Sequence, residues 1–309
     1  LSSEIKINKL ILENNLELKN FFPNSAKKIS FNNHLINLVY DQRKLSVNGK
    51  GNILLQDKED FISYSILKKK NIFDFKTNII VDKNPIIIDF LGYKKQLDTK
   101  SDINLKGIYI VNKKMNIESF SYKEKKNKFE LNQLTLNKNL EIKSFKKINL
   151  EYFDEDLRNN KIKIVNKDNL YIISGPKFNA NSLIENIIDD DSSKLKIFDR
   201  NFNFNLKIDQ VYLDKEHIIN DLYGYLNFKK NEIINAELDA SFSKNKKLKF
   251  TINSNELEKV TTLFLDRAEP IIKRYKFIKG YKYGSLDFYS SKKGNKSISN
   301  LKIYDFRLQ

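Results

Sequence analysis

Apolar and polar residues alternate along most of the chain, which is the period-two pattern of strands with one buried face. The clearest run extends from Phe202 to Ile208, where every second residue is apolar, and the run from Leu248 to Ile252 repeats it. Clusters of Asn, Asp, Lys and Gly separate such runs at intervals of about 8 to 15 residues, a spacing that favours an antiparallel meander over alternating strands and helices.

Two stretches break this alternation. Residues 179–189 carry apolar side chains at helical spacing, and either Asn179 or Asn181 can serve as the N-cap of a short helix. Residues 254–278 predict a second helix, in which Ser254 or Asn255 is the cap and Pro270 ends or kinks the first part. The residues from Asn24 to Asn37 fit a third short helix.

Each expected strand has an apolar face that must be hidden from water or used for binding. About 18 short strands side by side at ~4.8 Å would extend roughly 85 Å, and two or three helices are too few to cover such a sheet. A closed sandwich or barrel is the alternative. The mismatch favours a mainly β fold, an elongated antiparallel β-sheet that curls into a groove.

The chain shows no low-complexity linker. A division falls at Gly175 and Pro176, ahead of the first helical pattern. We therefore expect a β-groove segment over 1–175 and a second β segment over 176–309, with helices at about 179–189 and 254–278, as parts of one continuous chain.

The composition excludes several classes of site. Cysteine is absent and the 309 residues include only two His, so disulfides, thiolate metal sites and a His-rich metal centre are ruled out. The Asp214–His217 run and the Asp189–Asp191 run are expected to be solvated segments, and the Gly49–Gly51 stretch a bulge or bend. No catalytic residue, metal or cofactor is predicted, and we do not expect an enzyme.

Lys and Arg number 56 against 39 Asp and Glu, a formal net charge of +17. Two interpretations fit this excess: an anionic partner such as a membrane surface or a nucleic acid, or a codon bias that enriches Lys, Asn and Ile together. The basic residues are scattered among acidic ones, and no helix-turn-helix, zinc-finger or RNA-recognition pattern is present. We therefore expect no nucleic-acid partner.

Several stretches resemble the central and C-terminal regions of the AsmA-like, YhdP-type envelope proteins of the bridge-like lipid-transport superfamily. The stretches that carry this resemblance are Asp89–Lys95, Gly107, Leu131–Leu140, Leu150, Gly175–Leu183, Asn253–Asn255, Gly280–Phe288 and Ser299–Leu308. The last of these is similar to the family's G-x-L-x-I-x-D-F-R-[LV] ending. Lys282, Tyr283 and Gly284 depart from the pattern, because the family usually has paired glycines there.

The resemblance implies an elongated β-groove protein of the periplasm, anchored to the inner membrane, that carries or binds phospholipid between the inner and outer membranes. No run of about 18 uncharged apolar residues is present, so we expect the anchor in an upstream segment outside this sequence. The implied partners are phospholipid acyl chains and other envelope proteins. The alternative is a non-catalytic structural or interaction module in outer-membrane assembly.

The groove interpretation makes one set of apolar residues the candidate site. These residues share strand-face parity and are expected to face lipid, although each could equally belong to an ordinary core: Phe202, Phe204, Leu206, Ile208, Leu238, Leu248, Phe250, Ile252, Leu286 and Phe288. Contacts that are alike along such a wall would let an acyl chain slide with little barrier.

Overall fold

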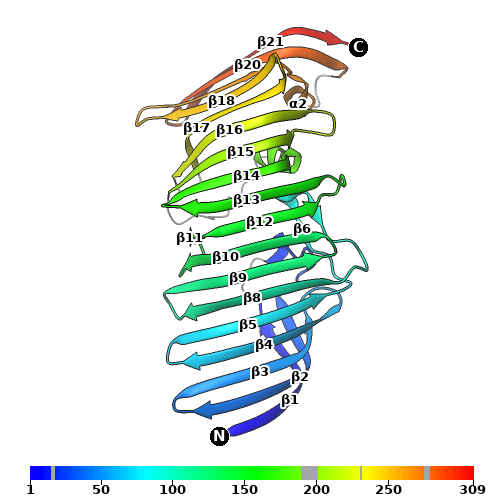
Figure 1. Ribbon diagram of the computed structural model, residues 1–309, viewed down its shortest axis with the longest axis vertical. Coiled ribbons are helices and arrows are strands. Elements are labelled where there is room, and N and C mark those ends of the chain that lie inside the picture. Colours follow the sequence, from blue (N-terminus) through cyan, green and yellow to red (C-terminus); the bar gives the residue numbers. More distant parts are fainter. Residues whose placement is uncertain (15–17, 189–200, 230–231, 275–278) are drawn as a thin grey trace. The chain divides into compact units, whose positions relative to one another are not determined.

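The computed structural model describes residues 1–14, 18–188, 201–229, 232–274 and 279–309 (Figure 1). The described residues form two compact units, unit 1 from Leu1 to Asn159 and unit 2 from Asn160 to Gln309. Gly175 and Pro176, where we expected a division, lie inside a strand of unit 2. No helix among the described residues is long and apolar enough to cross a bilayer.

Unit 1 is an antiparallel meander. Its main strands are β1 (Ser2–Glu13), β2 (Lys28–Asp41), β3 (Lys44–Leu54), β4 (Glu59–Lys69), β5 (Ile72–Val81), β8 (Ser101–Ile110), β9 (Lys114–Glu124), β10 (Asn127–Asn137), β11 (Ile142–Ser144) and β12 (Lys147–Phe153). Each strand from β1 to β10 pairs with the next in this order, and β10 pairs with both β11 and β12.

Smaller elements lie between these strands. A 3₁₀ turn, η1 (Leu18–Asn20), follows β1, and the connection between β5 and β8 holds a two-stranded hairpin, β6 (Ile87–Ile88) and β7 (Tyr93–Lys94), around a second 3₁₀ turn, η2 (Asp89–Leu91). The helix allowed for Asn24–Asn37 is therefore wrong. Most of that stretch is β2, which has hydrogen-bonded partners on both sides.

Unit 2 is a mixed sheet. Its strands are β13 (Asn159–Lys167), β14 (Leu170–Asn179), β15 (Phe202–Tyr212), β16 (Ile218–Lys229), β17 (Glu232–Ser243), β18 (Lys246–Ser254), β19 (Lys259–Leu265), β20 (Tyr281–Lys293) and β21 (Lys296–Leu308). Neighbours in this order pair antiparallel except β14 and β15, which run parallel. A parallel pair needs a crossover, and the segment that contains α1 (Asn181–Ile188) supplies it.

The helix expected at 179–189 is present as α1, and Asn179 Oδ1 accepts a hydrogen bond from the N–H of Asn181. The helix expected over 254–278 is wrong. The Asn255 side chain accepts the N–H groups of Leu257 and Glu258 in a tight turn, and β19 follows between two hydrogen-bonded strands. Only α2 (Glu269–Ile272) is helical among the described residues of that stretch, and Pro270 lies at its start.

The strand array of each unit is open. Among the described residues, no pairing joins β1 to β12 in unit 1 or β13 to β21 in unit 2, so neither unit closes into a barrel. The expectation of a mainly β, open-sheet fold with few helices is confirmed. Because an open sheet hides its faces only where something else covers them, the function of each unit depends on what lies over its apolar face.

Candidate functional site

The two faces of the unit 1 sheet differ sharply in chemistry. One cross-strand row runs through nine strands and consists of Ile5, Ile36, Gly49, Tyr64, Thr77, Leu105, Phe120, Leu131 and Ile148. The row beside it, on the opposite face, consists of Glu4, Asn37, Asn48, Ser65, Lys76, Lys106, Ser119, Asn132 and Lys147. The first face is apolar and the second is polar across the whole width of the sheet.

Most side chains of this apolar face stay partly accessible. Leu105, Phe120 and Leu131 are all half-buried, whereas the exposed neighbour Ser119 belongs to the polar face. A closed core would bury such large apolar side chains almost completely. The face is therefore an apolar surface that contacts solvent.

A cavity of about 330 Å³ opens on this face. Its walls come from four strands, β1, β2, β4 and β5, and are formed by Ile7, Leu10, Leu12, Phe31, His34, Ile36, Ile62, Tyr64, Ile66 and Thr77. In a flat sheet β1 and β5 would be separated by four strand spacings, about 19 Å. Because residues of both strands line one small cavity, the sheet curls around it.

His34 lies at this cavity with its ring edge-on to Phe31, at 5.4 Å between centroids, and stacked on Tyr64 at 5.9 Å. Its Nε2 is 2.9 Å from the carbonyl oxygen of Asn52, which accepts the ring proton. The ring fits because Gly51 has no side chain: a Cβ there would lie 2.3 Å from His34 Cδ2. The glycine-containing stretch of β3 thus provides space for an aromatic lining.

One edge of the unit 1 sheet, in the sense of the side where the strand ends lie next to one another, is sealed. Tyr93 of β7 is 1% exposed and packs edge-on against Tyr122, Phe129 and Tyr152. Its hydroxyl donates to Glu124 Oε2 at 2.6 Å and contacts the Tyr122 hydroxyl at 2.6 Å. Burial, together with these neighbours, raises the pKa of Tyr93 far above its usual range. The β5–β8 connection therefore closes this end of the apolar face with a fixed aromatic cluster.

Lys95 belongs to the same closed edge and is 2% exposed. Its ammonium donates to the carbonyl oxygens of Asp82 and Gln96. Burial lowers the pKa of Lys95, while nearby carboxylates, Glu124 first among them, oppose that shift. Lys95 therefore has a structural role in the β5–β8 connection, because its buried ammonium has two carbonyl acceptors and acidic neighbours.

The ten residues predicted from sequence lie in unit 2, and the strand registers place them on one face. One row across its nine strands contains four of them and consists of Ile164, Ile173, Leu206, Gly224, Leu238, Phe250, Leu263, Phe288 and Leu301. The neighbouring rows hold Phe202, Phe204, Ile208, Leu248, Ile252 and Leu286. The predicted set is thus contiguous, although its lipid contact stays a prediction.

Burial divides this set in two. Phe202, Phe204, Ile208, Leu248, Ile252 and Leu286 are buried, while Leu206, Leu238, Phe250 and Phe288 are half-buried. Phe202 and Phe204 pack on Tyr171, with ring centroids 5.0 and 5.5 Å away. The half-buried four form the accessible part of the face.

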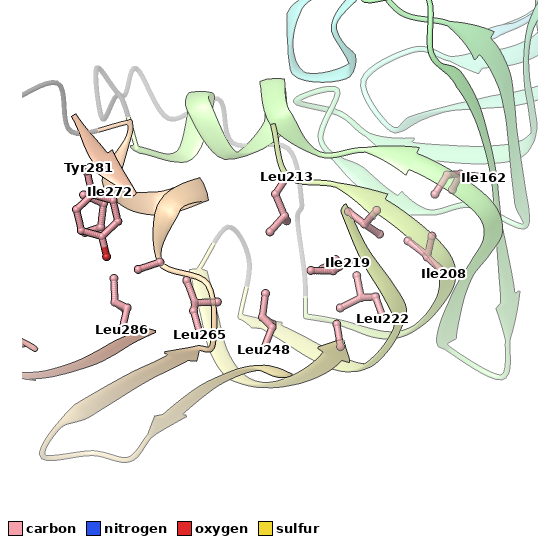
Figure 2. Packing of buried hydrophobic residues seen from close by; sticks show 13 residues of the cluster. Ile162, Ile208, Leu213, Ile219, Leu222, Leu248, Leu265, Ile272, Tyr281 and Leu286 are labelled. Carbon is pink, nitrogen blue, oxygen red and sulfur yellow. The ribbon is translucent and has the colours of Figure 1, made fainter. Parts of the chain in front are cut away.

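A packed cluster closes one end of the unit 2 face (Figure 2). Thirteen buried residues form it: Ile162, Ile208, Val211, Leu213, Ile219, Leu222, Ala240, Leu248, Leu265, Ala268, Ile272, Tyr281 and Leu286. Ala268 and Ile272, from the segment that carries α2, are almost fully buried against strand residues such as Leu265 and Leu286. This end is packed like an ordinary core.

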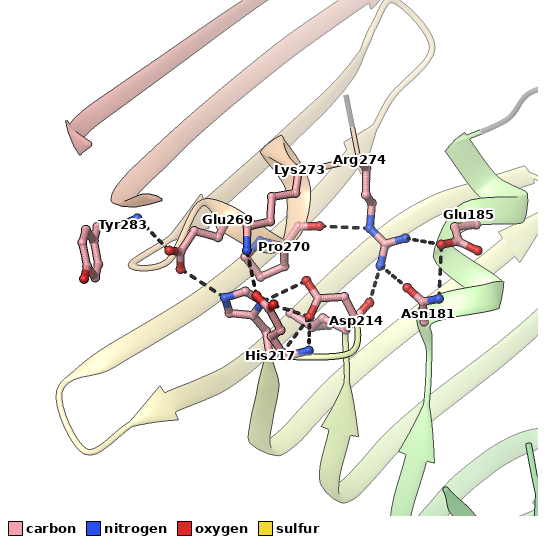
Figure 3. A network of polar contacts seen from close by, with 11 residues as sticks. Asn181, Glu185, Asp214, His217, Glu269, Pro270, Lys273, Arg274 and Tyr283 are labelled. Atoms are coloured by element: carbon pink, nitrogen blue, oxygen red, sulfur yellow. Dashed lines mark hydrogen bonds and ion pairs between the residues drawn. The ribbon is translucent and has the colours of Figure 1, made fainter. Parts of the chain in front are cut away.

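A polar network holds α2 over that core (Figure 3). The two ring nitrogens of His217 face Asp214 Oδ2 at 2.8 Å and Glu269 Oε2 at 3.1 Å, so the imidazolium donates to both carboxylates. Arg274 donates to Asn181 Oδ1 at 2.9 Å, to Pro270 O at 3.0 Å and to Leu213 O, and pairs with Glu185. The network joins the β15–β16 turn, α1 and α2.

The charges of this network perturb one another. The hydrogen bond with Asp214 raises the pKa of His217, although burial opposes it. Burial opposes ionisation of Asp214, but hydrogen bonds from the His217 ring and from two backbone N–H groups outweigh it and lower the pKa to about 2. The expectation that Asp214–His217 is a solvated segment is therefore wrong for His217, which is 6% exposed. Sequence gave no sign of Glu269, which lies 52 residues away.

The described residues contain no group of three or more His, Cys, Asp or Glu side chains arranged to hold a metal ion. The Asp189–Asp191 run lies outside the described residues. Sequence reasoning also missed the unit 1 face, because its strands alternate less regularly than β15 and β18 and carry bulges, such as the register shift in β2 between Asn32 and Leu35. No family model, curated protein or solved structure matches the chain.

Proposed function

We propose that the apolar faces of the two units bind the acyl chains of phospholipid and that the protein binds or carries such lipid between membranes. The observation that carries this proposal is the apolar row across nine strands of unit 1, which lies beside a fully polar row. None of its large apolar side chains is fully buried. Contiguous accessible apolar surface on a soluble sheet is typical of an interaction site.

The chemistry of the face suits a chain of methylenes. Each buried CH₂ contributes roughly 0.8 kcal/mol, without any requirement for a directional contact. The cavity of about 330 Å³ lies at the lower end of the size range of small-molecule sites, and its walls are almost entirely aliphatic and aromatic. An acyl chain can therefore enter it while other methylenes lie along the neighbouring half-buried rows.

The setting of this proposal comes from the sequence resemblance. Under this proposal the chain is part of a periplasmic protein that is anchored to the inner membrane. Its cargo is phospholipid, and other envelope proteins bind at its ends. No catalytic step is part of the proposal.

Recovery of lipid with the purified protein tests it. Native mass spectrometry should detect phospholipid bound to the protein, and Phe120→Asp should lower its occupancy about tenfold, because a carboxylate in the apolar row must be desolvated when a chain binds. Ser119→Asp is the matched control, since it places the same charge one residue away on the polar face.

The same comparison applies to unit 2. Phe250→Asp replaces a half-buried residue of the apolar row, and Asn253→Asp changes an exposed residue of the same strand on the other face. Circular dichroism and thermal unfolding establish that each variant is folded. If the folded Phe120→Asp and Phe250→Asp proteins keep as much lipid as their controls, the proposal is wrong.

A non-catalytic structural or interaction module is the second candidate, and the sealed end of unit 2 favours it. Thirteen buried residues and the His217 and Arg274 contacts make that end rigid and self-filled. Under this alternative the apolar faces contact protein. Two results together would support this alternative. The purified protein would carry no lipid, and variants of its apolar faces would lose binding to an envelope protein.

A further inference from the structure

Four turns of unit 1 lie along one edge of its sheet. The registers align the residues that flank them in a single row: Asp41, Lys44, Lys69, Ile72, Ile110, Lys114 and Asn137. The β2–β3, β4–β5, β8–β9 and β10–β11 turns therefore meet at this edge, opposite the edge sealed by Tyr93. Within unit 1 the successive turns can be followed in Figure 1.

This edge is strongly basic. Its turns, residues 41–44, 68–72, 110–114 and 137–141, carry eight basic side chains against two acidic ones, a net charge of +6. The eight, named here the basic rim, are Arg43, Lys44, Lys68, Lys69, Lys70, Lys113, Lys114 and Lys138, and all are exposed. The opposite edge mixes both signs, as in Asp57, Lys58, Asp82 and Lys83.

The basic rim differs from the polar face in its ion pairs. None of the eight forms an ion pair with an acidic residue in the part of unit 1 or unit 2 that the structure describes. On the polar face, by contrast, Lys106 pairs with Glu118 at 2.5 Å and Lys128 with Glu130 at 2.6 Å. The unpaired charge of the rim is thus available to an external anion.

The apolar face reaches this rim. The last row before the turns consists of Tyr40, Leu45, Lys68, Phe73, Tyr109, Met115 and Leu136. Lys68 Nζ lies 5.8 Å from the centre of the Phe73 ring, and the Phe73 and Tyr109 rings are 6.3 Å apart. Aromatic rings beside unpaired cations, at the border of an apolar surface, match the layered chemistry of a bilayer interface.

We propose that the basic rim docks the protein on an anionic phospholipid surface, where the rim contacts phosphate headgroups and the open end of the unit 1 apolar face meets the acyl layer. This deepens the proposed function, since it names the partner surface for the open end of the same face. Eight exposed cations over four adjacent turns are comparable to the basic clusters that bind anionic leaflets. The sealed edge, with its mixed charge and buried Tyr93, cannot serve in this way.

Flotation with vesicles tests the inference. The purified protein is mixed with vesicles of phosphatidylcholine alone or with 30% phosphatidylglycerol, and the co-floating fraction is measured at low and high NaCl. We expect binding to the anionic vesicles only, weakened by salt. The triple variant Lys68→Gln, Lys69→Gln, Lys70→Gln should lower the partition coefficient about tenfold or more.

The matched control removes the same charge from the opposite edge, with Lys58→Gln, Lys83→Gln and Lys126→Gln, and should keep the wild-type partition coefficient. Equal partition on both vesicle types, or equal losses in the two triple variants, would overturn the inference. If single-stranded DNA binds the protein at a lower phosphate concentration than anionic vesicles do, the inference is overturned in favour of a nucleic-acid partner.

The outcome is separable from that of the proposed function. If the rim variant still carries lipid in native mass spectrometry and its vesicle binding is unchanged, the docking role is removed and acyl binding stays intact. Salt-sensitive binding to anionic vesicles by a protein that never carries lipid would support docking and remove acyl binding.

Discussion

His217 and Glu269 lie 52 residues apart in the sequence, yet His217 Nε2 is 3.1 Å from Glu269 Oε2 in unit 2. Asp214 holds the other ring nitrogen at 2.8 Å, so the ring bridges the β15–β16 turn and the start of α2. Lys273 pairs with Glu216 beside this bridge at 2.7 Å. The contact fixes α2 over the packed cluster, and we expect the stability of this sealed end to depend on pH.

The first prediction concerns that pH dependence. The pKa of His217 is raised above 6.5, so its contribution to stability is complete below about pH 6.5 and is lost as the pH rises through the raised pKa. The pKa of Asp214 is lowered from 3.8 to about 2, so its contribution is present above pH 3.8 and is lost as the pH falls toward 2. Calorimetric Tm should therefore fall on both sides of mildly acidic pH.

His217→Gln should lower the free energy of unfolding at pH 6 by about 1–3 kcal/mol and flatten the alkaline decline, because the group that titrates there is gone. His34→Gln is the control, since the described polar contacts of His34 are with Asn52 and Tyr64 rather than with carboxylates. An unchanged alkaline decline in His217→Gln would contradict the assignment.

The second prediction separates the sealed and open parts of the unit 2 face. Leu248 is 9% exposed inside the thirteen-residue cluster, and Phe250 is half-buried two positions along the same strand. Leu248→Ala should cost about 2–5 kcal/mol, because the rigid cluster leaves a cavity. Phe250→Ala should cost less than Leu248→Ala although it removes more atoms, and urea unfolding of the two variants measures the order. The reverse order would mean that the open part is packed like a core.

The third prediction concerns the sealed edge of unit 1. Tyr93→Phe removes a 2.6 Å hydrogen bond to the buried Glu124, whose carboxylate keeps the Gln96 N–H and the Asn127 amide as donors. The loss should be about 1–3 kcal/mol, since a buried carboxylate loses one donor. Tyr152→Phe removes only a bond to the neutral carbonyl oxygen of Leu91 and should cost about 1 kcal/mol. Chemical unfolding that gives equal losses for the two variants would contradict this prediction.

The fourth prediction concerns Gly224, the one residue without a side chain in the apolar row of unit 2. Its φ of +142° is disfavoured for other residues, and a Cβ there would lie 1.9 Å from the Glu237 carbonyl oxygen in the next strand. Gly224→Ala should therefore destabilise unit 2 by about 3 kcal/mol or more, because strain and a backbone clash add. Gly294→Ala, in a turn with open space around the new methyl group, should cost about 1–2 kcal/mol when both are unfolded in urea.

Alternation identified strands and faces well where it was regular. Phe202, Phe204, Leu206 and Ile208 were assigned to one face of one strand, and they lie there, because side chains of a strand alternate whatever its neighbours are. The same logic failed over β19. Val260, Phe264 and Leu265 fit a helical spacing as well as a strand, and the hydrogen bonds to β18 and β20 decide the matter.

The sequence by itself determined that this protein is built from strands with one apolar and one polar side, since that pattern is local and has a period of two. Only the tertiary structure decided which end of each apolar face is sealed. Tyr93 meets Glu124 and His217 meets Glu269 through pairings of distant segments that leave no periodic signal in the chain. The gathering of Lys44, Lys69 and Lys114 at one edge is likewise a consequence of strand register, which long-range hydrogen bonding fixes.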